Sequence, residues 1–200
     1  MKFLAFVDMH QDLGDFAILQ ERLAANPDVK HIICLGDFTF FGQNMPELLE
    51  LLDSLEKDVF LIHGNHEDEE EIDKIIKKYA HITFVHKKIV EIDGVTFVFF
   101  GGGGFSSKEP EFKKLVRTHD SLLRSSKKIV LATHPPPYNT ILDELQPGWN
   151  VGVKDFKEFI ETYDPVLAIS GHIHENYKKQ GLHKKTLLVN PGGDGEIFEV

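Results

Sequence analysis

The chain has one cysteine, Cys34, among its 200 residues, which excludes a framework of internal disulfides. Cys34 lies in an apolar run over 32–35 and is predicted to be a core residue. Long apolar runs are also missing, since no segment approaches the roughly 20 residues that a membrane span needs. The apolar stretch 3–7 is too short for a signal sequence and stops at Asp8. A cytoplasmic protein without a membrane partner is therefore expected.

Positive charge is scarce. The chain has 22 Lys and Arg against 32 Asp and Glu, for a formal net charge of −10. Long nucleic acid is a poor partner for such a surface, because phosphate contacts need a basic footprint. Bound divalent cations would reverse the sign locally, so a small phosphorylated substrate, such as a phosphodiester or a nucleotide, stays compatible with the composition. The length and the 42% hydrophobic content fit one globular domain over residues 1–200.

The first third of the chain alternates between strand and helix patterns. Phe16, Leu19 and Leu23 recur at helical spacing, whereas the segment 3–7 is continuously apolar, as in a strand buried on both faces. The expected strands and helices alternate in the order 3–7, 12–25, 31–35, 46–55, 59–62 and 69–79. This order predicts parallel strands joined by crossover helices, and hence an α/β protein.

The rest of the chain predicts shorter strands and fewer helices. Asp93-Gly94 is a two-residue hairpin signal between two of the strands. Strands are expected at 82–85, 88–92, 95–100, 129–133, 166–170, 186–189 and 196–200, and helices at 110–125 and 155–162.

Five short polar blocks are the most informative feature of the sequence. They are Asp8-Met9-His10, Gly36-Asp37, Gly64-Asn65-His66-Glu67, Thr133-His134 and Gly171-His172-Ile173-His174. Most follow a predicted strand directly, where open α/β sheets place their binding crevices. Nitrogen and oxygen ligands without thiolate suit manganese, iron, zinc, nickel or cobalt better than a closed structural zinc site. The blocks therefore predict hydrolysis at a centre of two divalent metal ions.

In this order, the five blocks resemble the calcineurin-like metallophosphoesterase family. Its pattern is Asp-x-His, Gly-Asp, Gly-Asn-His-Asp/Glu, His and Gly-His-x-His. The resemblance implies a four-layer α/β sandwich, in which two mixed sheets are flanked by helices. It also implies two groups of metal ligands with a shared carboxylate, namely Asp8, His10 and His174, then Asn65, His134 and His172, with Asp37 as the bridge.

The resemblance implies a metal-dependent phosphoric ester hydrolase, with phosphodiesters as the first choice of substrate. In that mechanism a metal-bridging hydroxide attacks phosphorus, and His66 is the general acid that protonates the leaving group. Glu67 either orients His66 or begins the next helix. Phe38, Phe105 and Tyr138 are candidates to line a substrate pocket, although core or loop packing accounts for each equally well.

Three other functions stay open at this stage. A phosphomonoesterase is the close rival. A non-catalytic protein-binding scaffold on the same fold is a second, although relatives of that kind tend to lose ligands or the catalytic histidine. A nuclease is disfavoured by the acidic composition and the length. The sequence does not determine the substrate, the native metals or the oligomeric state.

Overall fold

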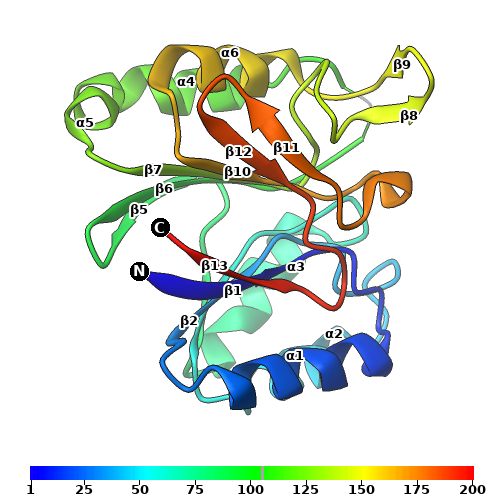
Figure 1. Cartoon of the computed structure of the whole chain (residues 1–200). Helices are drawn as coiled ribbons and strands as arrows, with labels where there is room; N and C mark the ends of the chain where they lie inside the picture. The colour runs from blue at the N-terminus through cyan, green and yellow to red at the C-terminus, as the bar shows by residue number, and fades with distance from the viewer. Residues whose placement is uncertain (105) are drawn as a thin grey trace.

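Two large β-sheets lie face to face, and helices cover the outer face of each (Figure 1). The computed structural model describes residues 1–104 and 106–200. Both sheets contain parallel and antiparallel neighbours. The predicted α/β sandwich of two mixed sheets flanked by helices is therefore confirmed.

The first sheet is built from the N-terminal part of the chain and closed by its last strand. Its order is β13 (Glu196–Glu199), β1 (Lys2–Phe6), β2 (His31–Cys34), β3 (Asp58–Leu61) and β4 (Ile82–Phe84). Strands β1 to β4 are parallel, and β13 pairs antiparallel with β1. The helices on this side are α1 (Leu13–Ala25), α2 (Met45–Asp53) and α3 (Glu69–Ile75), the last extended by the 3₁₀ turn η1 (Ile76–Lys78).

The second sheet comes from the C-terminal part. Its order is β11 (Gln180–His183), β12 (Thr186–Val189), β10 (Leu167–Ile169), β7 (Ile129–Thr133), β6 (Val95–Phe100) and β5 (Lys88–Ile92). The four central strands are parallel, and the two edge strands are antiparallel to their neighbours. The helices on this side are α4 (Pro110–Thr118), α5 (Asp120–Ser125) and α6 (Lys154–Tyr163), which lie along the top of Figure 1.

The structure corrects the sequence prediction at several points. The single helix predicted over 110–125 is two helices that meet at His119. The His119 ring bonds the carbonyl of Leu115 at 2.9 Å, and this bond caps the end of α4. Elements that the sequence did not predict are β11, the 3₁₀ turn η2 (His174–Asn176) and the hairpin of β8 (Glu144–Gln146) and β9 (Trp149–Asn150).

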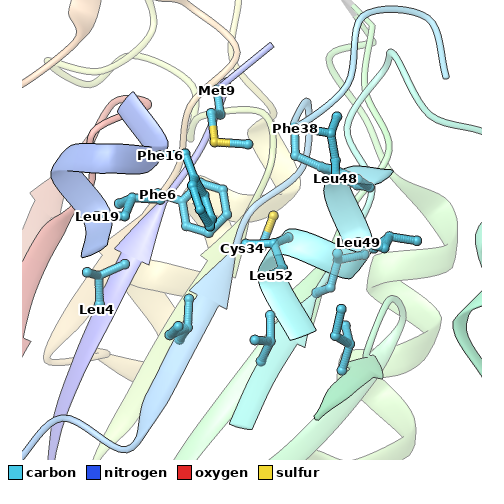
Figure 2. Packing of buried hydrophobic residues seen from close by; sticks show 14 of the residues in the cluster. Leu4, Phe6, Met9, Phe16, Leu19, Cys34, Phe38, Leu48, Leu49 and Leu52 are labelled. Carbon is cyan, nitrogen blue, oxygen red and sulfur yellow. The ribbon is translucent and has the colours of Figure 1, made fainter. Parts of the chain in front are cut away.

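Alternation along the strands divides the buried residues among the layers. On β1, Phe3 and Ala5 face the core between the two sheets, whereas Leu4 and Phe6 face α1 and α2. Figure 2 shows Leu4 and Phe6 packed with Phe16, Leu19 and other members of this outer core. Cys34 is fully buried there, as predicted. Each fully buried Phe or Leu side chain contributes about 1.5–3 kcal/mol to folding.

The packing of the two sheets brings strand ends of both to one edge of the molecule. β1, β2 and β3 end just before Asp8, Asp37 and Asn65, and β7 and β10 end just before His134 and His172. Within the described residues, no helix has the length and apolar character needed to cross a membrane. A cytoplasmic location stays a prediction.

Candidate metal centre

Backbone hydrogen bonds tie the loops of the two sheets together. The amide of Asp8 donates to the Gly36 carbonyl at 3.0 Å, which joins the loops after β1 and β2. The amide of Gly102, after β6, donates to the His63 carbonyl at 2.8 Å, and this bond crosses from the second sheet to the first. The loops that carry the polar blocks therefore form one connected surface.

Two of the motif glycines are required by close approach. A Cβ on Gly36, whose φ is +92°, would lie 2.2 Å from the Gly64 amide nitrogen. A Cβ on Gly64 would lie 2.0 Å from Asp37 Oδ1. Only glycine at both positions lets the β2 and β3 loops touch. This contact sets Asp37 against the Gly64-Asn65-His66 turn.

Four of the predicted ligands have left-handed backbone conformations. The φ angles are 56° for Asp8, 46° for His10, 50° for Asp37 and 69° for His172. Asp and His are among the few non-glycine residues enriched in this region, and residues held there cluster at functional sites. At His172 the conformation turns the chain, so that His172 and His174 both reach the centre although they are two residues apart.

The first half of the centre consists of Asp8, His10 and His174, whose potential ligand atoms lie within 4.8 Å of one another. His10 Nδ1 donates to the Thr39 carbonyl at 3.0 Å, so in the neutral ring Nε2 carries the lone pair. That Nε2 lies 3.2 Å from His174 Nε2. Asp8 Oδ1 is buried and has no hydrogen-bond partner among the described residues. The three side chains fit a bound cation.

The second half consists of Asp37, His134 and His172, with Asn65 beside them. His134 is fully buried, and its Nδ1 donates to the Leu35 carbonyl at 2.9 Å. Its Nε2 faces Asn65 Oδ1 at 3.1 Å and Asp37 Oδ2 at 3.4 Å. In the neutral ring this places a lone pair opposite two oxygen acceptors, which is the arrangement that a metal ion satisfies.

Electrostatics favour a positive charge at the same place. Burial opposes the charged imidazolium, but the hydrogen bond and charge of Asp37, together with Asp8, raise the pKa of His134 to about 9. Burial also opposes the Asp37 carboxylate, yet its interactions with His134 and His66 hold its pKa at about 2. The second half therefore holds a proton when it holds no other cation.

His66 lies beside the centre with one nitrogen directed into it. Its backbone amide donates to Asp37 Oδ1 at 2.8 Å, and its Nδ1 accepts from the Phe41 amide at 3.3 Å. In the neutral ring the proton is therefore on Nε2, which lies 3.9 Å from Asp37 Oδ2. Burial lowers the pKa of His66, and the Asp37 charge opposes that shift. The side chain is placed to donate a proton or a hydrogen bond toward the centre.

Glu67 has a role that the sequence did not predict. Its buried carboxylate accepts the amides of Asp37, Thr39 and Gly64, each at 2.9 Å, and the Thr39 hydroxyl at 2.8 Å. It therefore fastens the β2 loop to the β3 loop, and neither orients His66 directly nor begins α3, which starts at Glu69. The Gly-Asn-His-Glu block marks this residue in the sequence, but apart from Gly64 its partners come from a segment about thirty residues earlier.

The three residues predicted to line a substrate pocket have different positions. Phe38 is fully buried and packs in the outer core (Figure 2), so core packing is its role in this structure. Tyr138 is half-buried, lies with Trp149 along a cavity of about 600 Å³, and has the Lys154 ammonium 5.1 Å from its ring centre. Phe105 lies outside the described residues.

Comparison with known proteins gives one family. The model for calcineurin-like phosphoesterases matches residues 1–176. An uncharacterized protein of Methanocaldococcus jannaschii is 30% identical over 208 residues, which cover 96% of this chain and 88% of the relative. A protein of Coxiella burnetii described as a probable cyclic nucleotide phosphodiesterase is 31% identical over 156 residues, covering 73% of this chain and 60% of the relative.

Solved structures share the fold at low sequence identity. A Thermus thermophilus protein, TT1561, has a TM-score of 0.71 at 15% identity, covering 96% of this chain and 88% of the other. A dimetal phosphatase from Danio rerio has a TM-score of 0.61 at 12% identity, covering 97% and 88%. These likenesses extend over nearly the whole chain.

Proposed function

The chain belongs to the calcineurin-like phosphoesterase family, and we propose that it is a phosphodiesterase with two divalent metal ions in its active site. The ligands would be Asp8, His10 and His174 for one ion, Asn65, His134 and His172 for the other, and Asp37 between them. The protein acts on small phosphorylated substrates, not on long nucleic acid, because its net charge is −10.

The position of His134 Nε2 carries the proposal. The side chain is fully buried, and in the neutral ring the Nε2 lone pair faces Asn65 Oδ1 at 3.1 Å and Asp37 Oδ2 at 3.4 Å. Such a set of acceptors is costly in a protein interior unless a cation joins them. Divalent ions held there would supply Lewis-acid charge and would lower the pKa of bound water.

The chain's own groups perform the remaining steps. Asp37 holds the His66 backbone by the bond from the His66 amide to Asp37 Oδ1, so the imidazole keeps its place beside the centre. The Phe41 amide fixes the proton on His66 Nε2, which is the nitrogen directed toward Asp37 and the proposed centre. His66 donates that proton to the leaving oxygen as its negative charge develops.

The preference for diesters has support from one relative. The Coxiella burnetii protein is described as a probable cyclic nucleotide phosphodiesterase, and this chain spans 60% of it. Manganese, iron, zinc, nickel and cobalt are the candidate ions, because the ligands are nitrogen and oxygen without thiolate.

The test is a metal-reconstitution assay. Metal is stripped from the protein, and Mn²⁺, Fe²⁺, Zn²⁺, Ni²⁺, Co²⁺ or Mg²⁺ is added back in turn. Hydrolysis of bis-p-nitrophenyl phosphate is then compared with hydrolysis of p-nitrophenyl phosphate. We expect metal-restored turnover that favours the diester. Preference for the monoester would make the protein a phosphatase, and two bound ions without turnover on either ester would count against an esterase.

The role of His66 is tested with His66→Ala in the same assay. The variant should lose most turnover and keep its metal content, because the proposed role makes His66 a proton donor beside the centre and leaves it out of the ligand set, although its ring nitrogen lies near His10 and Asp37. Loss of metal together with activity would contradict the assigned role.

A further inference from the structure

The loop after β2, residues 38–44, exposes two aromatic rings beside His66. Phe40 is 48% exposed and Phe41 is 67% exposed. Their ring centres lie 5.3 and 4.2 Å from that of His66, and 4.9 Å from each other. Single exposed apolar side chains occur on any protein surface, but two neighbouring rings that both contact one imidazole form a local patch.

The backbone at Phe41 is in an unfavourable conformation for its residue type. Its φ is 51°, in the left-handed region, where a bulky side chain is an outlier and glycine or asparagine is preferred. If position 41 served folding alone, glycine or asparagine would stabilise the fold better than phenylalanine. The strain therefore points to a function of the exposed ring itself.

The two rings pack against the His66 imidazole beside the proposed centre, with the Phe41 backbone at the Nδ1 edge of that imidazole. The Phe41 amide bonds His66 Nδ1, and His66 Nε2 is directed toward Asp37. If the proposed function holds, a leaving oxygen that takes the Nε2 proton lies against the imidazole on which both rings pack, so the group attached to that oxygen is within reach of the two rings. His10 also borders it, with its ring centre 6.2 Å from that of Phe40.

We propose that Phe40 and Phe41 form an aromatic leaving-group subsite, which binds a flat aryl or heteroaryl ring on the alcohol released from a phosphodiester. Ring faces stack on aromatic side chains without needing one particular hydrogen-bond pattern. The segment Phe38-Thr39-Phe40-Phe41-Gly42-Gln43-Asn44 contains no Lys or Arg. This segment offers no cation to pair with a second phosphate, so the subsite as proposed takes an uncharged alcohol. This inference rests on the proposed diesterase activity.

A matched pair of substrates tests the subsite. Methyl benzyl phosphate and methyl cyclohexylmethyl phosphate release primary alcohols of similar size, but only one alcohol has a flat aromatic ring. We expect the metal-loaded protein to release benzyl alcohol with the higher kcat/KM. Phe40→Leu and Phe41→Asn should each lower kcat/KM for the benzyl ester about tenfold, near the lower end of what base–aromatic stacking contributes. The cyclohexylmethyl ester should change by less than about twofold.

Folding is controlled separately. Asparagine suits the left-handed backbone at position 41, so Phe41→Asn should melt at the same temperature as the parent or higher, while the ring is lost. Leu122→Ala removes another exposed apolar side chain, on α5 of the outer helix layer, and should leave both kcat/KM values unchanged. The subsite would be overturned if Phe40→Leu and Phe41→Asn lowered kcat/KM equally for both esters, or lowered it for neither ester.

Calorimetric binding of benzyl phosphate and cyclohexylmethyl phosphate separates this inference from the proposed function. A preference for the benzyl ligand that the two loop variants abolish supports the subsite even if no diester is hydrolysed. In that case the proposed activity is what fails. Hydrolysis of both esters without any ring preference in turnover or binding would keep the activity and reject the subsite.

Discussion

Two clusters of side chains in this molecule look alike by distance and differ in chemistry. Asp37, His134 and His172 form one cluster, and His63, Glu69 and His86 form the other. In each, three potential ligand atoms lie within 4.8 Å of one another, and two of the three residues are buried. Proximity alone would make both of them metal sites.

The hydrogen bonds separate the two clusters. His134 gives its Nδ1 proton to the Leu35 carbonyl, so its Nε2 lone pair points into the cluster. His86 Nδ1 instead accepts from the Gly101 amide at 2.8 Å, so in the neutral ring the proton is on Nε2, the nitrogen directed at Glu69. Glu69 is paired with the Lys87 ammonium at 3.0 Å. In the second cluster only His63 therefore offers a lone pair, because its Nδ1 donates to the Gly64 carbonyl, while His86 presents a proton and Glu69 a neutralised carboxylate.

Burial alone does not decide the charge of a histidine. Burial lowers the pKa of His86 to about 2, and the charges of His63 and Lys87 add to the effect. His134 is buried still more completely, yet Asp37 and Asp8 raise its pKa to about 9. The two buried carboxylates beside His134, not the depth of its side chain, therefore mark the candidate cation site.

The largest expected effect comes from removing the shared carboxylate. Asp37→Asn keeps the shape of the side chain but loses the charge that serves both halves of the proposed centre. Several kcal/mol of charge stabilisation should disappear, so turnover of bis-p-nitrophenyl phosphate should fall about a thousandfold, and metal content by elemental analysis should fall below two ions per chain. Asp28→Asn, at an exposed pair with Lys2, and His86→Asn, in the second cluster, should keep both ions. Loss of metal from His86→Asn would break the distinction between the clusters.

A smaller loss is expected from Glu67→Gln. The glutamine side chain has an NH2 group in place of one carboxylate oxygen. This NH2 group would face backbone N–H groups that donate to Glu67 in the parent, so the connection between the Asp37 and Gly64 loops weakens. Residues that hold metal ligands in place typically account for about 10–100-fold in affinity or activity. Turnover and metal affinity should therefore both decrease within that range. Glu70→Gln changes an exposed carboxylate near the start of α3 and serves as the matched control. Equal turnover and equal metal affinity in the two variants would show that Glu67 does not hold the Asp37 and Gly64 loops together.

How far the sequence predicts this site depends on which interactions are local. The parallel strands and the residues that follow them could be predicted, because apolar runs and polar blocks are both visible along the chain. Phe38 and Phe41 show where prediction from the sequence stops, because the pattern of a loop does not indicate which side chains are buried. Both lie in one loop without periodicity, yet Phe38 is fully buried and Phe41 is 67% exposed.

Contacts between distant segments account for the other differences. Two of the partners of Glu67 lie at 37 and 39, and no local pattern indicates them. The break at His119 depends on a side-chain bond to the Leu115 carbonyl, without a proline or glycine to mark it. The β8–β9 hairpin consists of three- and two-residue strands, which are too short for alternation to be recognised.

Proton release should distinguish the His134 cluster in solution. Below about pH 9 the imidazole of His134 holds a proton that must leave before Nε2 can bind a metal ion. Affinity for one of the two ions should therefore rise about tenfold per pH unit up to that point. Calorimetric titration of Mn²⁺ at pH 7.5 in two buffers of different ionisation enthalpy measures the released proton. His134→Gln should remove this release, and an unchanged release in that variant would assign the proton to another group.

The smallest effect concerns the stability contributed by the second cluster. His86 has a pKa of about 2 in the folded protein, against an ordinary value of 6.5. The unfolded chain therefore binds a proton that the folded protein excludes between those two pH values. This contribution is complete above about pH 6.5 and is lost as the pH falls toward 2. Between pH 6.5 and 5.5 the loss approaches about 1 kcal/mol.

His86→Asn isolates that contribution. Asparagine keeps an acceptor for the Gly101 amide and does not titrate, while His63, Glu69 and Lys87, which face the ring, stay in place. Urea unfolding at pH 7.0 and 5.5 should show a smaller acid-induced loss of stability in the variant than in the parent, by about 1 kcal/mol. Because the other histidines are common to both proteins, the difference between the two losses belongs mainly to His86. Identical acid sensitivity would mean that His86 is not held neutral by its surroundings, and the contrast with His134 would then rest on hydrogen-bond geometry alone.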